Sequence, residues 1–341
     1  MATRTYQKHA PITRRRDLRW IRAFRRLLAE HTENLCELAY TELGKPPFET
    51  LTSDIVPLLA SCRWHAGRIL RARRLRGASL WQLGQRHRVL RVPLGRVAII
   101  ATWNYPIQLL GIQLVQAVAA GNSVVVKPSE RSPDTQGLLL DLARRAGLGE
   151  DRLTRTEATR EAGERLLNDE AFDHVVFTGS TSVGRGIAKT LGESLTPSTL
   201  ELSGCDSAIV LSDADPGLAA RSIYFALSLN SGQTCMAPRR AIVHQNAHER
   251  FVETLLGLAR ERPASPPTNP EERERCEALV RDAVALGGRA IAGSLVVDRC
   301  PPEAALAMGE HFGPAMAILV AESDEHAVGL HTRFTQHLAT S

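Results

Sequence analysis

The chain has 341 residues, of which 43% are hydrophobic and 23% charged, the composition of an ordinary soluble globular protein of about two domains. Its 42 basic and 37 acidic residues give a formal net charge of +5, and the excess lies in the first hundred residues, where arginines alternate with apolar residues at helical spacing. We therefore expect a solvated helix face there and no nucleic-acid partner.

The cysteines indicate a cytoplasmic protein without disulfides or metal. The six cysteines lie at positions 36, 62, 205, 235, 276 and 300, with no CxxC pair and no histidine cluster at metal-ligand spacing. The sequence contains no run of eighteen apolar residues, so no membrane span is predicted, and the N-terminus lacks the short apolar core of a secretory signal.

Apolar positions that recur at intervals of three and four predict two N-terminal helices, over 13–43, ending at Gly44, and over 50–72. From Val92 onward strands alternate with helices. We expect strands at 95–103, 123–128, 173–179, 198–204 and 207–212, and helices at 106–121, 134–147, 182–195 and 215–230. After these come a strand at 239–244, a helix at 247–261, a Pro-rich surface connection at 262–275, a helix to 286, a weaker strand at 289–297 and a last strand at 315–320. Crossover units of this kind predict an α/β fold with a mostly parallel sheet covered on both faces.

The segment FTGSTSVGR, residues 177–185, is a candidate anion site. Gly179 ends a strand, and the hydroxyl residues from Ser180 onward open a helix, whose N-terminal N–H groups and dipole favour a phosphate. The alternative is an ordinary Gly/Ser turn that caps a helix. The GxGxxG fingerprint of common dinucleotide folds is absent from every expected strand-to-helix turn.

Two further strand ends carry polar residues. In VVVKPSE, Lys127 could hold a ribose hydroxyl or phosphate and Glu130 a ribose diol; the alternative is a charged pair in a loop. In ATWNYP, Trp103 and Asn104 follow a strand. The Asn104 amide could point at a developing oxyanion, or Asn104 could be an N-cap ahead of Pro106.

Glu201 and Cys235 are the remaining candidates. Glu201 interrupts an apolar strand in LELSGCD, so its carboxylate is either exposed on the polar face of the sheet or held in a cleft with a raised pKa, suited to general-base work. Cys235 lies among small and turn-favouring residues in NSGQTCMAP, a motif without the histidine that usually activates a cysteine nucleophile.

Six motifs follow one another along the chain: TWNYP at 102–106, KPSE at 127–130, FTGSTSVG at 177–184, ELSG at 201–204, GQTC at 232–235 and EHFGP at 310–314. In order and spacing they resemble the NAD(P)-dependent aldehyde dehydrogenase superfamily, and the similarity spans nearly the whole chain. The resemblance implies a Rossmann-like NAD-binding domain over 1–204, with an oligomerisation strand pair near 78–92, and a second α/β domain, the catalytic one, over 205–341.

The resemblance also implies roles for the catalytic candidates. Cys235 would attack an aldehyde to form a thiohemiacetal, and the Asn104 amide and the backbone N–H of Cys235 would stabilise the oxyanion. Glu201 would activate the water that hydrolyses the resulting thioester. The product would then be an acid rather than an acyl coenzyme A. An alternative that keeps the enzyme but changes the reaction is coenzyme-A-acylating or semialdehyde-phosphate chemistry.

The implied cofactor contacts come from several motifs. Lys127 and Glu130 would bind the adenosine ribose, Ser180 and Trp103 the pyrophosphate, and Glu310 with Phe312 the nicotinamide-side ribose. Gly179, Gly184 and Leu202 complete the expected cofactor site. A carboxylate at Glu130 would repel a 2′-phosphate, which favours NAD while NADP stays possible.

The chain also departs from the family pattern. LTRTEATR, residues 153–160, replaces a glycine-bearing strand, and Ser203 stands where a second glycine is usual. The span from Cys235 to Glu310 is short, and the family continues beyond Ser341, so we expect a C-terminally truncated chain. The family forms homo-oligomers, and the sequence does not decide whether this chain does. The alternative to an active enzyme is an inactive homologue that still binds a dinucleotide.

Overall fold

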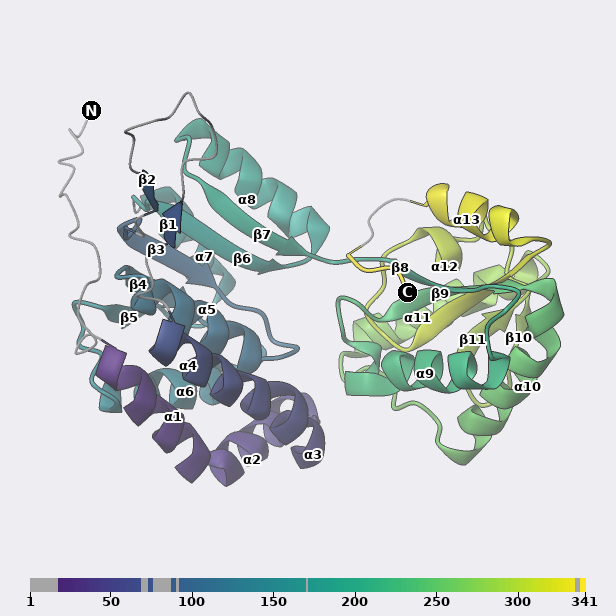
Figure 1. Cartoon of the computed structure of the whole chain (residues 1–341), viewed down its shortest axis with the longest axis horizontal. Coiled ribbons are helices and arrows are strands. Elements are labelled where there is room, and N and C mark those ends of the chain that lie inside the picture. The colour runs from purple at the N-terminus through teal and green to yellow at the C-terminus, as the bar shows by residue number, and fades with distance from the viewer. Residues whose placement is uncertain (1–17, 69–72, 76–86, 90–91, 170, 335–337) are drawn as a thin grey trace. The chain divides into compact units, whose positions relative to one another are not determined.

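The computed structural model describes residues 18–68, 73–75, 87–89, 92–169, 171–334 and 338–341. The chain forms two compact units, Met1–Glu201 and Leu202–Ser341 (Figure 1). The boundary falls within the ELSG motif, whereas the family resemblance implies a division after residue 204.

A five-stranded sheet forms the centre of the first unit. Its strands, in spatial order, are β5 (Leu153–Arg155), β4 (Ser123–Lys127), β3 (Arg96–Ile100), β6 (His174–Gly179) and β7 (Ser198–Leu202). The first four are mutually parallel. The helices are α5 (Gln108–Ala119), α6 (Pro133–Arg145), α7 (Arg160–Asp169) and α8 (Thr181–Glu193). β3 and β4 are almost wholly buried, as their Val/Ile runs predict for a sheet covered on both faces.

The described residues before this sheet form the helices α1 (Arg19–Glu30), α2 (Thr32–Leu43), α3 (Pro47–Thr50) and α4 (Val56–Arg68), with the π-helical turn η2 (Leu51–Ile55) between α3 and α4. Phe24, Leu28 and Leu58 are fully buried in one core with Ile99 of β3. The prediction of one continuous helix over 13–43 is wrong, because His31 leaves helical geometry at φ −111° and separates α1 from α2. Its predicted end is confirmed: Gly44 adopts the left-handed φ of 64° that stops α2.

A second five-stranded sheet, ordered β10-β11-β12-β9-β8, forms the second unit. The strands are β8 (Asp206–Val210), β9 (Pro238–His244), β10 (Arg289–Ala290), β11 (Leu295–Asp298) and β12 (Ala315–Ala321). Only the pairing of β10 with β11 is antiparallel among the described strands of this sheet. Helices α9 (Pro216–Ser228) and α10 (Gln245–Glu261) belong to one buried core. Helices α11 (Pro270–Ala285), α12 (Ala305–Met308) and α13 (Asp324–Thr332) belong to another, on the opposite face (Figure 1).

The α/β class with largely parallel sheets is confirmed, and several local predictions are corrected. In LTRTEATR only the first three residues form a strand, the short edge strand β5, and α7, which was not predicted, begins at Arg160. The weaker strand predicted over 289–297 is a hairpin, turned at Gly293 with φ 79°. α11 begins at Pro270, inside the predicted surface connection.

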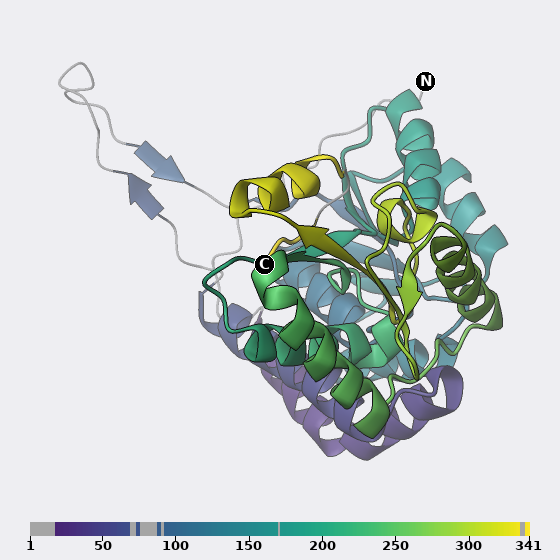
Figure 2. The same ribbon diagram turned by 90° about the vertical axis from the view of Figure 1, so that its right-hand side faces the viewer.

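The predicted oligomerisation strands fall mostly outside the described residues. Figure 2 shows β1 (Arg73–Leu75) and β2 (His87–Val89) side by side as an antiparallel ribbon. Of the predicted segment 78–92, residues 78–86 and 90–91 lie outside the described residues. The role of this segment in oligomerisation stays a prediction.

Candidate active site

The loops after β3, β4 and β6 lie at one edge of the first sheet, because the carboxyl ends of these parallel strands share that edge. β3 has β4 on one side and β6 on the other, the kind of position at which open α/β sheets bind ligands. The buried Gln136 amide connects two of the loops. It donates to the Thr102 carbonyl oxygen at 2.7 Å and accepts from the Ser129 N–H at 2.7 Å.

Asn104 lies in the turn after β3 and is 4% exposed. Its Oδ1 accepts from Thr102 Oγ1 at 3.1 Å. It is not the N-cap of α5, which was the alternative interpretation. The carboxylate of Asp54 fills that role instead, accepting from the N–H groups of Ile107 at 3.1 Å and Gln108 at 3.0 Å.

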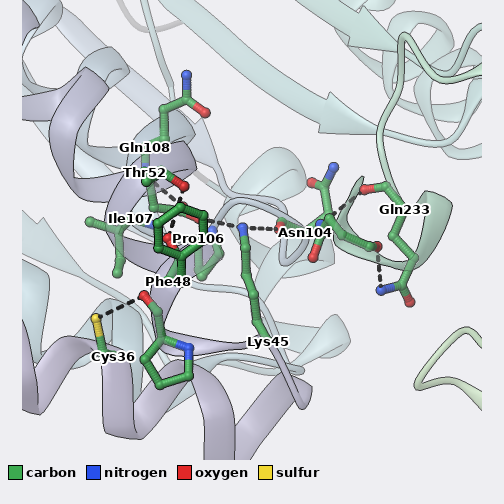
Figure 3. Close-up of polar contacts among 12 residues, drawn as sticks. Cys36, Lys45, Phe48, Thr52, Asn104, Pro106, Ile107, Gln108 and Gln233 are labelled. Atoms are coloured by element: carbon green, nitrogen blue, oxygen red, sulfur yellow. Dashed lines mark hydrogen bonds and ion pairs between the residues drawn. The ribbon is translucent and has the colours of Figure 1, made fainter. Parts of the chain in front are cut away.

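Lys45, between α2 and α3, supports the same turn from the other side. Its ammonium group forms an ion pair with Asp54 and lies 3.9 Å from the centre of the Tyr105 ring. It also donates to the Asn104 carbonyl oxygen at 3.3 Å, as Figure 3 shows. Burial lowers the pKa of Lys45 from its ordinary value. This pair could not be predicted from the sequence, because no periodicity in GKPPFETLTSD marks the lysine and the aspartate as partners.

Lys127 and Glu130 are brought together after β4. They form an ion pair in which Lys127 is buried and Glu130 is 46% exposed at the side chain. Gly163 of α7 packs against the lysine stem: a Cβ at that position would lie 3.6 Å from Lys127 Cε, an ordinary van der Waals distance. The amine is thus fixed at the edge of the sheet, with the carboxylate at its solvent side.

A pocket of about 370 Å³ opens beside this pair. Its volume is within the range of small-molecule sites. It is lined by Pro128, Pro133, Asp134, Gly137, Leu138, Asp141, Arg155, Thr156 and Ala158. The lining comes from the loop after β4, from α6 and from the end of β5, so the strand that the sequence analysis left uncertain forms one wall.

Ser180 begins α8, and its Oγ accepts from the Val183 N–H at 3.4 Å, as an N-cap does. Gly179 has no room for a side chain, because a Cβ would come within 2.4 Å of the Phe177 ring, and Gly184 is buried in the first turn of α8. On the loop after β3, the strand beside β6, the Trp103 ring lies 4.8 Å from the guanidinium of Arg131, which belongs to the loop after β4. Gly179 thus ends β6 and Ser180 caps α8, which fits both an anion site and the alternative of an ordinary capping turn, so the phosphate role stays a prediction.

Cys235 lies in the second unit, in the loop between α9 and β9. Three consecutive left-handed residues precede it by a few positions: Asn230 at φ 51°, Ser231 at φ 55° and Gly232 at φ 71°. Two of them are not glycine, which costs energy that the surrounding contacts must offset. The Asn230 Nδ2 donates to the Gln233 carbonyl oxygen at 3.2 Å, and the Gln233 Nε2 donates to the Asn230 carbonyl oxygen at 3.1 Å.

Three loops meet at the amino ends of β8, β9 and β12 in this second sheet. A Cβ on Gly232 would come within 2.4 Å of the backbone of Gly313 and Pro314, and a Cβ on Gly204 within 3.1 Å of the Cys235 carbonyl oxygen. The cysteine loop therefore packs backbone to backbone against the ELSG and EHFGP motifs. This explains why glycine is needed at Gly232, where φ is positive as well.

Cys235 differs from the other cysteines in its accessibility. Of the six, it alone is partly exposed, and all six are free thiols. Burial raises the pKa of Cys62, Cys276 and Cys300 to about 12 and shifts those of Cys36 and Cys205 in the same direction. The buried thiols are therefore poor nucleophiles.

Glu310 and Phe312 lie in the loop before β12. Arg275 of α11 donates to the Glu310 carbonyl oxygen, and the Phe312 N–H donates to the Glu272 carboxylate. Between them His311 is buried, and burial, with Arg239 and Arg275 nearby, holds its pKa well below the ordinary 6.5.

Glu201 and Leu202 end β7. The Glu201 side chain is exposed and Leu202 is half-buried. Glu201 is the last residue of the first unit and Cys235 belongs to the second. In the described part of the chain no helix is long and apolar enough to cross a membrane, and the same residues contain no cluster of three metal-ligating side chains.

A family model described as "Aldehyde dehydrogenase family" matches residues 1–335. A probable coniferyl aldehyde dehydrogenase of Pseudomonas aeruginosa is 37% identical over 240 residues, which cover 69% of this chain and 50% of that protein. The chain spans about half the length of the first relatives that it matches.

Solved structures share the fold. The γ-glutamyl-γ-aminobutyraldehyde dehydrogenase of Burkholderia cenocepacia has a TM-score of 0.87 at 29% identity, covering 96% of this chain and 71% of that one. An aldehyde dehydrogenase of Mycobacterium tuberculosis, solved with NAD+, has a TM-score of 0.82 at 25% identity, covering 93% and 70% of the two chains.

Proposed function

The chain belongs to the aldehyde dehydrogenase family, and we propose that it oxidises an aldehyde to a carboxylic acid with NAD as the hydride acceptor. The observation that carries the proposal is Cys235. Its thiol is partly exposed, whereas the other five cysteines are buried. The loop that carries it is strained and packs against the ELSG and EHFGP motifs.

In the proposed reaction the Cys235 thiolate adds to the aldehyde carbon, and the carbonyl oxygen becomes an oxyanion. The Cys235 N–H and the Asn104 amide donate to that oxyanion. Bound NAD supplies the acceptor for the hydride that leaves the same carbon, after which a thioester remains on Cys235. Glu201 then takes a proton from the water that attacks the thioester, and the acid leaves as the thiolate returns.

The first unit fits a dinucleotide. The pocket of about 370 Å³ is large enough for an adenine ring, and the Lys127–Glu130 pair beside it offers an amine and a carboxylate to ribose hydroxyls. The N-terminus of α8 at Ser180 suits a pyrophosphate. In this proposal 1–204 is the NAD-binding domain and 205–341 the catalytic domain, in which Glu310 and Phe312 would bind the nicotinamide-side ribose.

The Glu130 carboxylate is the reason to prefer NAD over NADP. It would accept hydrogen bonds from a free 2′-hydroxyl and would repel a 2′-phosphate. The free state of all six cysteines agrees with the reducing, cytoplasmic location that we propose.

The test is aldehyde-dependent NADH formation by the purified chain, with substrates that include coniferyl aldehyde, after the Pseudomonas relative. We expect turnover by the wild type and none by Cys235→Ala, with Cys300→Ala as the control for loss of a thiol in the same unit. NAD binding by calorimetry without turnover of any aldehyde would instead support the binding-only homologue. Full activity of Cys235→Ala would refute the assigned nucleophile, and a coenzyme A thioester as product would replace hydrolysis by acyl transfer.

A further inference from the structure

Two consecutive arginines at the start of β9, Arg239 and Arg240, are fully buried at 0% exposure. Arg239 donates through Nη1 to the Gly313 carbonyl oxygen, and through Nη2 to the carbonyl oxygens of Gly232 at 2.8 Å and Thr234 at 3.1 Å. Within the described residues no carboxylate forms an ion pair with it. Backbone carbonyl dipoles thus provide the observed hydrogen-bond acceptors for this buried cation.

Burying a guanidinium without a carboxylate partner is costly, because desolvation disfavours the charge. The planar fork of an arginine can recover part of that cost by reaching several acceptors in fixed directions, which the ammonium group of lysine cannot do. Here the acceptors belong to two loops, the one that leads to Cys235 and the one that precedes β12. One side chain therefore ties the GQTC and EHFGP motifs together.

The bond to Thr234 has a specific consequence for the cysteine. The Thr234 carbonyl and the Cys235 N–H belong to the same planar peptide unit, so fixing the direction of the C=O fixes that of the N–H. A charge-assisted hydrogen bond to the carbonyl also polarises the unit and makes its N–H a stronger donor.

We propose that Arg239 is a positioning residue for the oxyanion site, holding and polarising the Thr234–Cys235 peptide whose N–H meets the oxyanion. This inference rests on the function proposed above. We expect the positive charge of Arg239, which is hydrogen-bonded to the peptide unit of the Cys235 N–H, also to favour the reactive thiolate of that cysteine.

Arg240 provides a matched control within the chain. It is equally buried, but its Nε donates to Ser207 Oγ at 2.9 Å, its Nη1 to the Ala307 carbonyl oxygen at 2.7 Å and its Nη2 to the Cys205 carbonyl oxygen. The guanidinium lies 4.1 Å from the centre of the Phe334 ring. None of these contacts is with the loop from Gly232 to Cys235, so its replacement disturbs packing without releasing the Thr234–Cys235 peptide.

The experiment compares Arg239→Lys, Arg239→Met and Arg240→Lys with the wild type. It measures kcat and KM for the aldehyde, the NAD dissociation constant, the unfolding midpoint, and the pH dependence of Cys235 alkylation by iodoacetamide, followed by mass spectrometry. We expect both Arg239 variants to lose kcat by about ten- to a hundredfold, the effect of a misplaced catalytic group, with NAD affinity kept. Arg239→Met should shift the alkylation profile to higher pH, and Arg240→Lys should lower the unfolding midpoint while leaving kcat and the alkylation profile unchanged.

Equal losses of kcat in Arg239→Lys and Arg240→Lys would overturn the proposal, as would an unchanged alkylation profile in Arg239→Met. Should Arg239→Met not fold, Arg239→Gln replaces it in the alkylation experiment, because glutamine also removes the charge, and an unchanged profile in that variant would overturn the proposal as well. Alkylation needs no turnover, so the role of Arg239 can fail or stand even if the wild type oxidises no aldehyde. Absence of aldehyde oxidation by the wild type would refute the proposed function and leave the alkylation test of Arg239 valid.

Discussion

Lys45 and Asp54 form an ion pair that is almost completely shielded from solvent, with 1% and 0% of their side chains exposed. Asp54 caps α5 and Lys45 binds the Asn104 carbonyl oxygen, so the two charges hold both ends of the turn that presents Asn104. The N-terminal helices thus support the candidate oxyanion residue as well as covering the sheet.

Removing one member of this pair should be severe. Lys45→Met or Asp54→Asn leaves an uncompensated buried charge or donor, which costs about 3–5 kcal/mol of stability. The double variant should cost less than the sum of the single variants, since neither charge is then left alone. Urea unfolding measures these values. Glu30→Gln, in the exposed Arg26–Glu30 pair, is the control and should cost under about 0.5 kcal/mol. Strictly additive single effects would contradict the coupling.

Gly232→Ala should abolish activity. The added Cβ would lie 2.4 Å from the backbone of Gly313 and Pro314, and the native φ of 71° is strained for alanine. The cysteine loop would have to move away from the EHFGP loop. The control is Gly257→Ala in α10, where nothing lies within 4 Å of the new Cβ and alanine favours the helix. NADH formation should be lost in the first variant and kept in the second; an active Gly232→Ala enzyme would show that the loop contact is dispensable.

His311 should make the protein less stable in acid. Its folded pKa lies well below 6.5, so between that value and pH 6.5 the unfolded chain binds a proton that the folded chain does not. The free energy of unfolding therefore falls as the pH falls below 6.5, by at most about 1.4 kcal/mol per pH unit from this group. In His311→Gln the unfolding midpoint should fall less between pH 7 and pH 5 than in the wild type, whereas exposed His326→Gln should keep the wild-type slope. Identical slopes in all three proteins would refute this origin.

Glu130→Gln should relax the choice of cofactor. The variant loses the charge that opposes a 2′-phosphate and leaves Lys127 without its ion-pair partner. We expect the ratio of kcat/KM for NADP to that for NAD to rise by about tenfold, a modest value because Glu130 is half exposed and screened. Initial rates with the two cofactors measure this ratio, and Glu161→Gln, an exposed carboxylate on α7, serves as the charge control. A ratio unmoved by Glu130→Gln would place the selectivity elsewhere.

The α/β class could be predicted because buried parallel strands such as β3 and β4 are continuous Val/Ile runs, and Gly44 marked a helix end by its backbone freedom. β5 was left uncertain because it is three residues long, with two of them exposed. α7 was missed because its sequence is mostly polar. Both depend on the neighbouring sheet more than on local pattern.

The supporting residues of the site could not be predicted from local sequence. Asp54 acts on N–H groups more than fifty positions away, and Arg239 joins carbonyl groups of loops that adjoin β9 and β12. RRAIVH predicts a strand correctly, but nothing in it distinguishes a buried arginine from one at the surface. The catalytic and cofactor roles assigned from the motifs stay predictions, for which the variants above are the test.

The central claim is that Cys235 carries the substrate as a thioester that Glu201 helps to hydrolyse. Glu201→Gln, mixed with an aldehyde and NAD, should release about one NADH per chain and then stop, because hydrolysis lacks its base. Mass spectrometry of the digested protein should find the acyl group on the peptide that contains Cys235. Continued turnover at the wild-type rate, or an acyl group on any other residue, would contradict the account.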